Sequence, residues 1–321
     1  MEAEGAPISL FGWPGRRLAP AASGGLCVVG APTDHGNVIS RGSAQGPAAI
    51  RRASLNLAAP QIPGSDIGDV DRSDSPDPEM FMDRIAAVTG DICELGLCPL
   101  LLGGDHSISF ASVSVLQRKR DLCLIWFDAH TDFSPWSGQS FHNHKQVLRR
   151  ISKLDGVSRI VQIGHRGITG EDETRLGSKS AVVTTAGART LDERALLELV
   201  PADLPCYISI DIDVVDPFRA PGTSAPVPDG LQPRQVKSLL QALVRNREIV
   251  GADLVEVNPS LDREGATSLV AADLIHSIAE TWSHQRALRE AGESGAVRRS
   301  ALPDEAAAQA VAAAPALCGG K

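Results

Sequence analysis

The chain has 321 residues, of which 43% are hydrophobic, and a formal net charge of −8 at pH 7. This length and apolar content suit one large α/β domain or two smaller ones. The negative charge argues against binding to nucleic acid or to an anionic membrane, and no run of 18 apolar residues suggests a membrane-spanning helix.

The localisation follows from the same features. No signal-like apolar segment follows Met1, and the six cysteines show no CxxC spacing. A disulfide framework is unexpected for a chain of this size. We therefore expect a cytoplasmic protein with reduced, mostly buried thiols.

Apolar, β-prone runs alternate with helix-like segments along the chain. We expect strands at residues 26–30, 67–70, 98–102, 122–127, 159–164, 181–184, 205–210 and 249–255. Helices are expected at residues 48–57, 76–96, 108–119, 147–154, 191–199, 232–247 and 267–289. Unbroken apolar strands between helices are typical of a parallel sheet that is covered on both faces.

Composition changes near both ends of the chain. Residues 1–24 are rich in Gly, Pro and Ala and predict an irregular arm. Residues 291–321 turn to Ala, Gly and charge, which predicts a flexible Ala-rich tail. The segment between them, residues 25–290, is expected to form a single catalytic domain.

Three of the apolar strands run directly into residues that commonly bind metals. His106 follows the strand at 98–102. Asp128, His130 and Asp132 follow the strand at 122–127, and Asp211 and Asp213 follow the strand at 205–210. Ligands of parallel α/β sheets bind beside the carboxyl ends of strands, so these side chains are expected to converge.

The spacing within these groups predicts an extended chain. On a strand, residues i and i+2 project from the same face, so Asp211 and Asp213 should point the same way, with Cβ atoms about 6–7 Å apart. The same periodicity relates Asp128, His130 and Asp132 while the chain stays extended. Taken alone, residues 209–217 could equally be a solvated acidic turn.

The residue types indicate the class of metal. The set contains no thiolate, which argues against structural zinc, and carboxylates with imidazoles suit Mn²⁺ as well as Fe, Co or Ni. Four carboxylates carry too much negative charge for one divalent ion, so two ions about 3.5–4 Å apart fit better. A water between them would supply hydroxide near neutral pH for attack on an electron-poor carbon.

Several segments of the sequence resemble the ureohydrolase family, which includes arginases, agmatinases, guanidinobutyrases and formiminoglutamases. They are GGDHS at 103–107, DAHTD at 128–132, SIDIDVVDP at 209–217 and RGSAQGPAAIR at 41–51, together with Glu256 in DLVEVNP. The resemblance implies a three-layer α/β/α fold with a mainly parallel eight-stranded sheet. It also implies a binuclear manganese centre and a homo-oligomer, either a trimer or a hexamer.

The resemblance further implies roles for the candidate ligands. One manganese ion would bind His106, Asp128, Asp132 and Asp211, and the other His130, Asp128, Asp211 and Asp213. A bridging hydroxide would attack the guanidinium carbon of a small guanidino substrate and yield urea and an amine. Asp132 would also hold the proton of the hydroxide.

Four further residues are candidates for substrate binding and proton transfer. Glu256 matches the position that pairs with the guanidinium, a planar cation suited to a bidentate carboxylate. The leaving amine needs a proton, for which His144 is the first candidate and His142 the alternative. Arg166, at the end of a predicted strand, is a candidate for substrate binding.

The sequence departs from the family pattern around the substrate. Lys145 stands where glycine usually follows the histidine, and this cation would suit a carboxylate-bearing substrate tail. Residues 222–226 read GTSAP in place of GTGTP, and the segment 165–169 lacks the aspartates that hold the α-amino group in arginases. Arginine is therefore disfavoured, and the chain is more similar to the agmatinase-like branch.

The substrate remains open between several guanidino compounds, namely agmatine, 4-guanidinobutyrate, 3-guanidinopropionate or a biosynthetic intermediate. Two alternatives use the same ligand set differently. One is hydrolysis of a formimino group, as in formiminoglutamate, and the other is a metal-bound regulatory subunit without catalysis.

Overall fold

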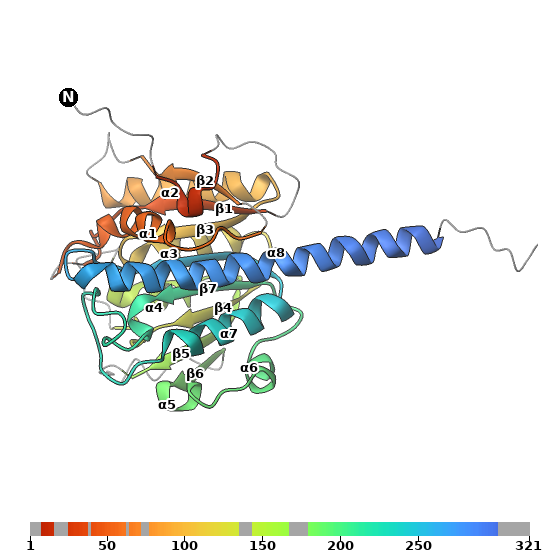
Figure 1. Cartoon of the computed structure of the whole chain (residues 1–321). Helices are drawn as coiled ribbons and strands as arrows, with labels where there is room; N and C mark the ends of the chain where they lie inside the picture. The colour runs from red at the N-terminus through yellow and green to blue at the C-terminus, as the bar shows by residue number, and fades with distance from the viewer. Residues whose placement is uncertain are drawn as a thin grey trace, which may run out of the picture.

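A computed structural model of the chain describes residues 8–15, 25–37, 40–61, 64–71, 77–134, 143–166 and 179–300, with the backbone alone over 284–300. The described residues form eight strands between two layers of helices (Figure 1).

The strands form one sheet, and all of its neighbouring pairs are parallel. Their bounds are β1 Leu26–Ala31, β2 Ser65–Asp69, β3 Cys98–Gly103, β4 Leu122–Phe127, β5 Val157–His165, β6 Ser180–Thr184, β7 Cys206–Asp211 and β8 Ile249–Val255. The spatial order is β2-β1-β3-β8-β7-β4-β5-β6. Each strand predicted from the sequence is present, with bounds shifted by two residues or fewer.

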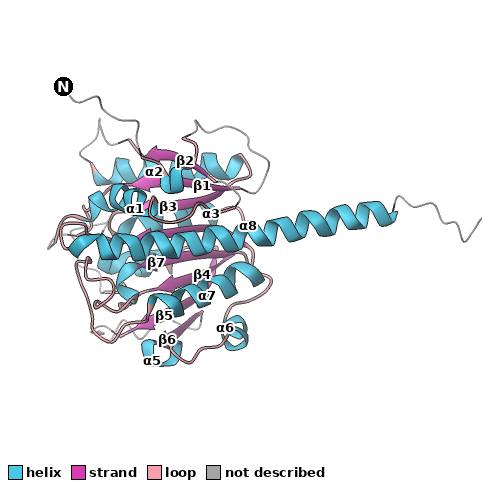
Figure 2. Cartoon of the chain, viewed as in Figure 1, coloured by secondary structure: helices cyan, strands magenta, loops and turns pink. Residues whose placement is uncertain are grey.

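Helices cover both faces of this sheet (Figure 2). They are α1 Gly46–Ser54, α2 Pro78–Glu94, α3 Ser109–Leu116, α4 Val147–Ile151, α5 Thr185–Ala188, α6 Glu193–Leu199, α7 Pro233–Asn246 and α8 Ala266–Ser300. On one face α8 packs against α1 and α7, and on the other α3 packs against α2 and α4. The predicted three-layer α/β/α fold is confirmed.

Burial explains why these elements form. Every residue of β4 is at most 1% exposed, as expected for a central strand with helices on both sides. Helix α7 buries a stripe of Val236, Leu239, Leu240 and Leu243, whose spacing places them on one helical face. The core lies between these apolar faces and the sheet.

The strand order places the functional groups. The candidate ligands follow β3, β4 and β7, and Glu256 follows β8. These four strands are consecutive neighbours at the centre of the sheet, in the order β3-β8-β7-β4. Because all four run parallel, their carboxyl ends meet at one edge, where open α/β sheets bind ligands.

The last helix differs from the sequence-based expectation. Helix α8 continues to Ser300 and projects beyond the sheet (Figure 1), whereas the sequence predicted its end near residue 289. The sequence turns to Ala, Gly and charge from residue 291, but a glycine within a helix costs only about 1 kcal/mol relative to alanine. The Ala-rich stretch after Ser300 lies outside the described residues.

Part of the N-terminal arm belongs to the core. Leu10, Phe11 and Trp13 are at most 6% exposed. The Leu10 amide donates to Asp66 Oδ2 at 2.7 Å, and the Phe11 amide donates to Ser54 Oγ at 2.8 Å. These bonds fix residues 8–15 to β2 and α1, so this portion is packed rather than loose.

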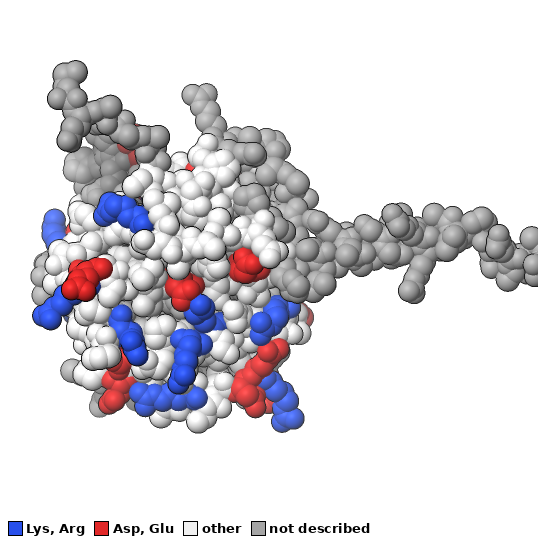
Figure 3. Space-filling view, in the orientation of Figure 1, with Lys and Arg blue, Asp and Glu red and all other residues white. Residues whose placement is uncertain are grey.

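On the face seen in Figure 3, the described residues form no large field of one sign. Figure 3 shows lysine and arginine side chains interspersed with aspartate and glutamate on the face that carries α7 and α8. In the part of the chain that the structure describes, no helix is long and apolar enough to cross a membrane. The five cysteines within this part are free thiols.

Candidate metal centre and active site

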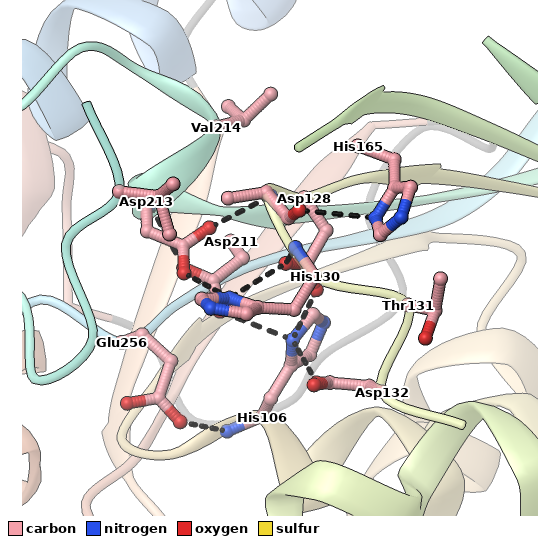
Figure 4. A network of polar contacts seen from close by, with 12 residues as sticks. His106, Asp128, His130, Thr131, Asp132, His165, Asp211, Asp213, Val214 and Glu256 are labelled. Atoms are coloured by element: carbon pink, nitrogen blue, oxygen red, sulfur yellow. Dashed lines mark hydrogen bonds and ion pairs between the residues drawn. The ribbon is translucent and has the colours of Figure 1, made fainter. Parts of the chain in front are cut away.

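Two groups of potential metal ligands lie at the carboxyl edge of the sheet (Figure 4). One consists of His106, Asp128 and Asp132, and the other of Asp128, His130 and Asp213. Within each group the ligand atoms lie within 4.8 Å of one another. Asp128 belongs to both groups, so the two sets form one continuous cluster.

His106 aims a buried nitrogen at three carboxylates. Its Nδ1 lies 3.3 Å from Asp128 Oδ2, 3.1 Å from Asp132 Oδ2 and 3.3 Å from Asp211 Oδ2. None of these contacts has hydrogen-bond geometry, and Nδ1 has no hydrogen-bond partner among the described residues. A buried nitrogen that faces three carboxylate oxygens without bonding to them has the arrangement of a metal ligand.

The second group is closed by Asp213. His130 Nδ1 lies 2.9 Å from Asp213 Oδ2, and Asp213 Oδ1 accepts from the Ala129 amide at 2.9 Å. The His130 amide donates to Asp128 Oδ1 at 2.6 Å. The segment after β4 is therefore bonded to the segment after β7.

The extended geometry expected for these ligands is wrong. Strand β7 ends at Asp211, and Ile212–Val214 form a 3₁₀ turn that the Asp211 carboxylate caps by accepting from the Asp213 amide at 2.8 Å. After β4 the chain also leaves the strand, and Asp132 has a φ of 49°. Turns expose main-chain N–H groups, and these stabilise crowded carboxylates in a way that a strand ladder cannot.

The buried carboxylates of the cluster need positive charge nearby to be stable in their ionised forms. Burial and the neighbouring Asp213 and Asp128 raise the pKa of Asp211 well above its usual range. Burial and Asp128 raise the pKa of Asp132 to about 6. Burial alone would lower the pKa of His130, but its bonds to Asp128 and Asp213 raise it to about 12.

Burial and the neighbouring charges together cause these shifts. Like charges in a buried site disfavour ionisation unless a cation or a proton neutralises them. Oxygen and imidazole donors without thiolate match the preference of Mn²⁺ and related divalent ions. The residues present therefore fit a divalent metal centre.

A hydrogen-bonded row behind the cluster orients His106. Its Nε2 lies 2.8 Å from Ser209 Oγ, and this hydroxyl donates to Asp253 Oδ1 at 2.7 Å. Asp253 Oδ2 accepts from the Tyr207 hydroxyl at 2.7 Å. Partners of this kind fix the ring and tautomer of a metal-binding histidine.

Trp126 supports the same ligands from the neighbouring strand. Its ring stacks on His106 with centroids 4.0 Å apart, and its Nε1 donates to Asp128 Oδ2 at 2.9 Å. In the sheet register Trp126 is opposite Ser209, and Ser209 is opposite Asp253.

No function was predicted from the sequence for Trp126, Ser209 or Asp253. A signal was present, because Trp126 and Ser209 each stand two residues before a candidate ligand, and the two-residue period of a strand places them on the same face.

Glu256 and His144 lie beside the cluster. Glu256 Oε1 accepts from the His106 amide at 2.9 Å and lies 3.1 Å from His144 Nδ1. Burial opposes the change, but the bond to Glu256 raises the pKa of His144, while the bond from His144 lowers the pKa of Glu256. A charged pair is favoured. His142, the alternative to His144, lies outside the described residues.

Arg166 has different contacts from those expected of a substrate-binding residue. Its Nη2 donates to the carbonyl oxygens of Asp213 at 2.6 Å and Val227 at 2.8 Å, and its Nε to that of Pro228 at 3.0 Å. Its Nη1 donates to the Gly164 carbonyl at 3.2 Å. The guanidinium therefore joins the end of β5 to two loops of the site.

Asp216 shapes the turn that follows the candidate ligands Asp211 and Asp213. Its carboxylate accepts from the amides of Phe218 and Gly230, both at 2.9 Å. The third carboxylate of the 209–217 segment is thus outside the ligand cluster.

A cavity of about 560 Å³ opens above the cluster. Ligand residues and Glu256 form one part of its lining, and His144 lies beside them. The remaining wall includes Lys145, Arg166 and residues 223–228. This volume lies in the range typical of sites for small molecules.

Comparisons with known proteins agree with this geometry. A model of the arginase family matches residues 25–280. The chain is 35% identical over 280 residues to a mitochondrial arginase from Medicago truncatula, covering 80% of this chain and 81% of that protein. It is 32% identical over 275 residues to a guanidinopropionase from Pseudomonas aeruginosa, covering 78% and 84%.

Solved structures show the same similarity. The proclavaminate amidino hydrolase of Streptomyces clavuligerus superposes with a TM-score of 0.78 at 28% identity, covering 87% of this chain and 97% of that one. A hypothetical agmatinase from Burkholderia thailandensis superposes with a TM-score of 0.76, also at 28% identity, covering 87% and 92%.

Proposed function

The chain belongs to the arginase family of hydrolases, and from this membership we propose that it is a binuclear manganese amidinohydrolase. It hydrolyses a linear guanidino compound to urea and an amine. The observation that carries the proposal is Asp128, which is shared by two ligand groups whose other members include His130, Asp132 and Asp213, all of which line the cavity. A shared carboxylate is the usual bridge between two divalent ions.

The proposed ligand sets follow the family pattern. His106, Asp128, Asp132 and Asp211 hold one ion, and His130, Asp128, Asp211 and Asp213 hold the other. When bound, such a pair of ions lowers the pKa of a water molecule toward neutrality and so supplies a nucleophile.

Glu256 positions the guanidinium group. Its Oε1 already accepts from the His106 amide, whereas Oε2 has no hydrogen bond to the described residues. Oε2 is therefore available to a guanidinium N–H, and a charge-assisted bond of this kind orients the planar cation. Glu256 also has a φ of 64°, a strained conformation for a residue with a side chain, which is typical of functional sites.

His144 supplies the proton for the leaving amine. The Glu256 carboxylate favours its charged form, so the imidazole can serve as a general acid near neutral pH. Asp132 lines the cavity beside the other ligands, where its carboxylate can accept a hydrogen bond from the nucleophile.

A urea-release screen with Mn²⁺-loaded protein tests this function. The substrates are agmatine, 4-guanidinobutyrate, 3-guanidinopropionate and arginine, and we expect urea from one of the first three. Metal content is measured on the same sample. Bound metal with no urea from any compound would contradict the proposal and favour formimino hydrolysis or a catalytically silent subunit.

The proposal extends to the organisation of the protein. Residues 25–290 form the catalytic domain, flanked by the N-terminal arm and the Ala-rich tail, and the protein assembles in the cytoplasm as a trimer or hexamer. Light scattering of the full chain measures the assembly, and a monomeric mass would contradict this part.

A further inference from the structure

Charges of both signs line the cavity. Its acidic residues are Asp132, Asp211, Asp213 and Glu256. The lysine and the arginine of its described lining are Lys145 and Arg166. A molecule bound in the cavity therefore meets negative charge at the candidate metal ligands and Glu256, and positive charge at Lys145 and Arg166.

Of the two cations, Lys145 is the one that a ligand can bind. The guanidinium of Arg166 already donates to main-chain carbonyls of Gly164, Asp213 and Val227. Lys145 is exposed, and no hydrogen bond or ion pair joins its ammonium group to the residues that the structure describes.

The backbone holds Lys145 in a fixed place beside the reacting groups. Its amide donates to Asn143 Oδ1 at 2.9 Å, and its carbonyl accepts from the Ser134 amide at 2.9 Å. The preceding residue is His144, whose ring lies 3.1 Å from Glu256. The ammonium group is thus carried by the same short segment as the proposed proton donor.

The rest of the wall is uncharged. Ala225, Pro226, Val227 and Pro228 contribute apolar surface to the lining, which suits a chain of methylene groups. Among the described lining residues, no carboxylate is left over for a second cationic group of the substrate.

We propose that the substrate is an ω-guanidino carboxylic acid whose carboxylate pairs with Lys145. This inference rests on the proposed hydrolysis and specifies its substrate class. The guanidinium lies at Glu256, the methylenes lie along residues 225–228, and the ammonium of Lys145 binds the carboxylate through charge-assisted hydrogen bonds. A diamine-like tail would instead place a cation against Lys145.

Three guanidino compounds of similar length differ mainly in the charge at the end opposite the guanidinium. 4-Guanidinobutyrate ends in a carboxylate, agmatine ends in an ammonium, and butylguanidine is uncharged at that end. We expect kcat/KM for urea release to be at least about tenfold higher for 4-guanidinobutyrate than for agmatine, with butylguanidine between them, since complementary charge discriminates between ligands. A preference for agmatine would overturn the inference.

Variants at Lys145 test the residue itself. Lys145→Met should lower the ratio of kcat/KM for 4-guanidinobutyrate to that for butylguanidine by at least about tenfold, and Lys145→Glu should make agmatine the better substrate. Lys119→Met, which removes an exposed lysine that does not line the cavity, is the matched control and should keep the ratio. An unchanged ratio in Lys145→Met would contradict the role.

Calorimetric binding to the Mn²⁺-loaded protein separates this inference from the proposed hydrolysis. Tighter binding of 4-guanidinobutyrate than of agmatine, lost in Lys145→Met, supports the carboxylate site even if no urea forms, and only the hydrolysis would then fail. Tighter binding of agmatine overturns the carboxylate site whether or not urea is produced.

Discussion

Asp128 connects the two halves of the candidate centre. Its Oδ2 faces His106 and accepts from Trp126, and its Oδ1 accepts from the His130 amide. It is 1% exposed, so a carboxylate held there needs its partners on both sides. A change at this residue should affect both ions, whereas a change at a terminal ligand should affect mainly one.

Asp128→Ala should reduce bound Mn²⁺ to less than one ion per chain and abolish urea release, because both ligand groups lose a member. Metal analysis of the purified variant and a urea assay check this. Asp155→Ala, at an exposed aspartate outside the cavity, is the control and should bind metal as the unaltered protein does. Full activity of Asp128→Ala would show that the mechanism is wrong.

His144→Ala should lower kcat by about 10²–10⁴ while metal content stays unchanged, since the change removes a general acid but no ligand. The measurement is steady-state kinetics alongside metal analysis. A normal rate for His144→Ala together with a slow His142→Ala would instead assign proton transfer to His142.

Ser209→Ala should weaken Mn²⁺ binding by about 10–100-fold, because His106 loses the partner that fixes its ring and Asp253 loses a donor. Titration with Mn²⁺ gives the affinity, and excess metal should restore much of the activity. Ser277→Ala removes a buried hydroxyl from α8, away from the centre, and serves as the control. Equal metal affinities for the two variants would argue against the orienting role of Ser209.

At the scale of elements, Arg166 joins parts of the chain that the sequence separates. Its guanidinium connects β5 to the 3₁₀ turn Ile212–Val214 and to the loop at 227–228. The 3₁₀ turn contains Asp213, and residues 227–228 line the cavity. These contacts make Arg166 a positioning residue for the site, and the substrate-binding role suggested by its place in the sequence stays a prediction.

Arg166→Leu should lower the free energy of unfolding by about 1–3 kcal/mol and reduce kcat, because carbonyl oxygens that it pairs lose their donors. Arg166→Lys should recover part of both. Thermal unfolding and kinetics are compared with Arg189→Leu, which removes an exposed arginine bound to Asp229 and Gly230 carbonyls. An increase in KM alone, with stability unchanged, would favour direct contact with the substrate.

At the scale of the whole molecule, the centre gathers the ends of the four central strands. Ligands follow β3, β4 and β7, and Glu256 after β8 bonds to the His106 amide. A cation bound there should link these strand ends in the folded state. In the unfolded chain the same residues are far apart and cannot form the site.

Removal of metal should therefore lower the midpoint of thermal unfolding. A ligand of the folded state at 100 times its Kd adds about 2.7 kcal/mol to stability, and that addition disappears with a chelator. Calorimetry with Mn²⁺, with chelator, and after Mn²⁺ is restored checks the effect. The same midpoint in all three samples would contradict a metal site that spans these strands.

Much of the fold could be predicted from local sequence. Continuous apolar runs such as 122–127 revealed the buried strands, and the helical period revealed α7, because hydrophobic periodicity records which face is buried. The GGDHS, DAHTD and SIDIDVVDP segments indicated the family, which the comparisons confirm. The ends of elements were predicted less well: α8 continues to Ser300, beyond its predicted end near residue 289, because a glycine weakens a helix by only about 1 kcal/mol and does not by itself end it.

The sequence by itself determined the elements of the sheet, the family and a candidate set of donors at strand ends. The tertiary structure decided how those donors are held: the turn at Asp213, the row from His106 through Ser209 to Asp253, and the carbonyls that bind Arg166. It also decided that Lys145 lines the cavity with an exposed side chain. The physical reason is separation along the chain. The burial pattern of a strand or helix depends on residues that are close in sequence, whereas these contacts join distant residues and depend on strand order and register across the sheet.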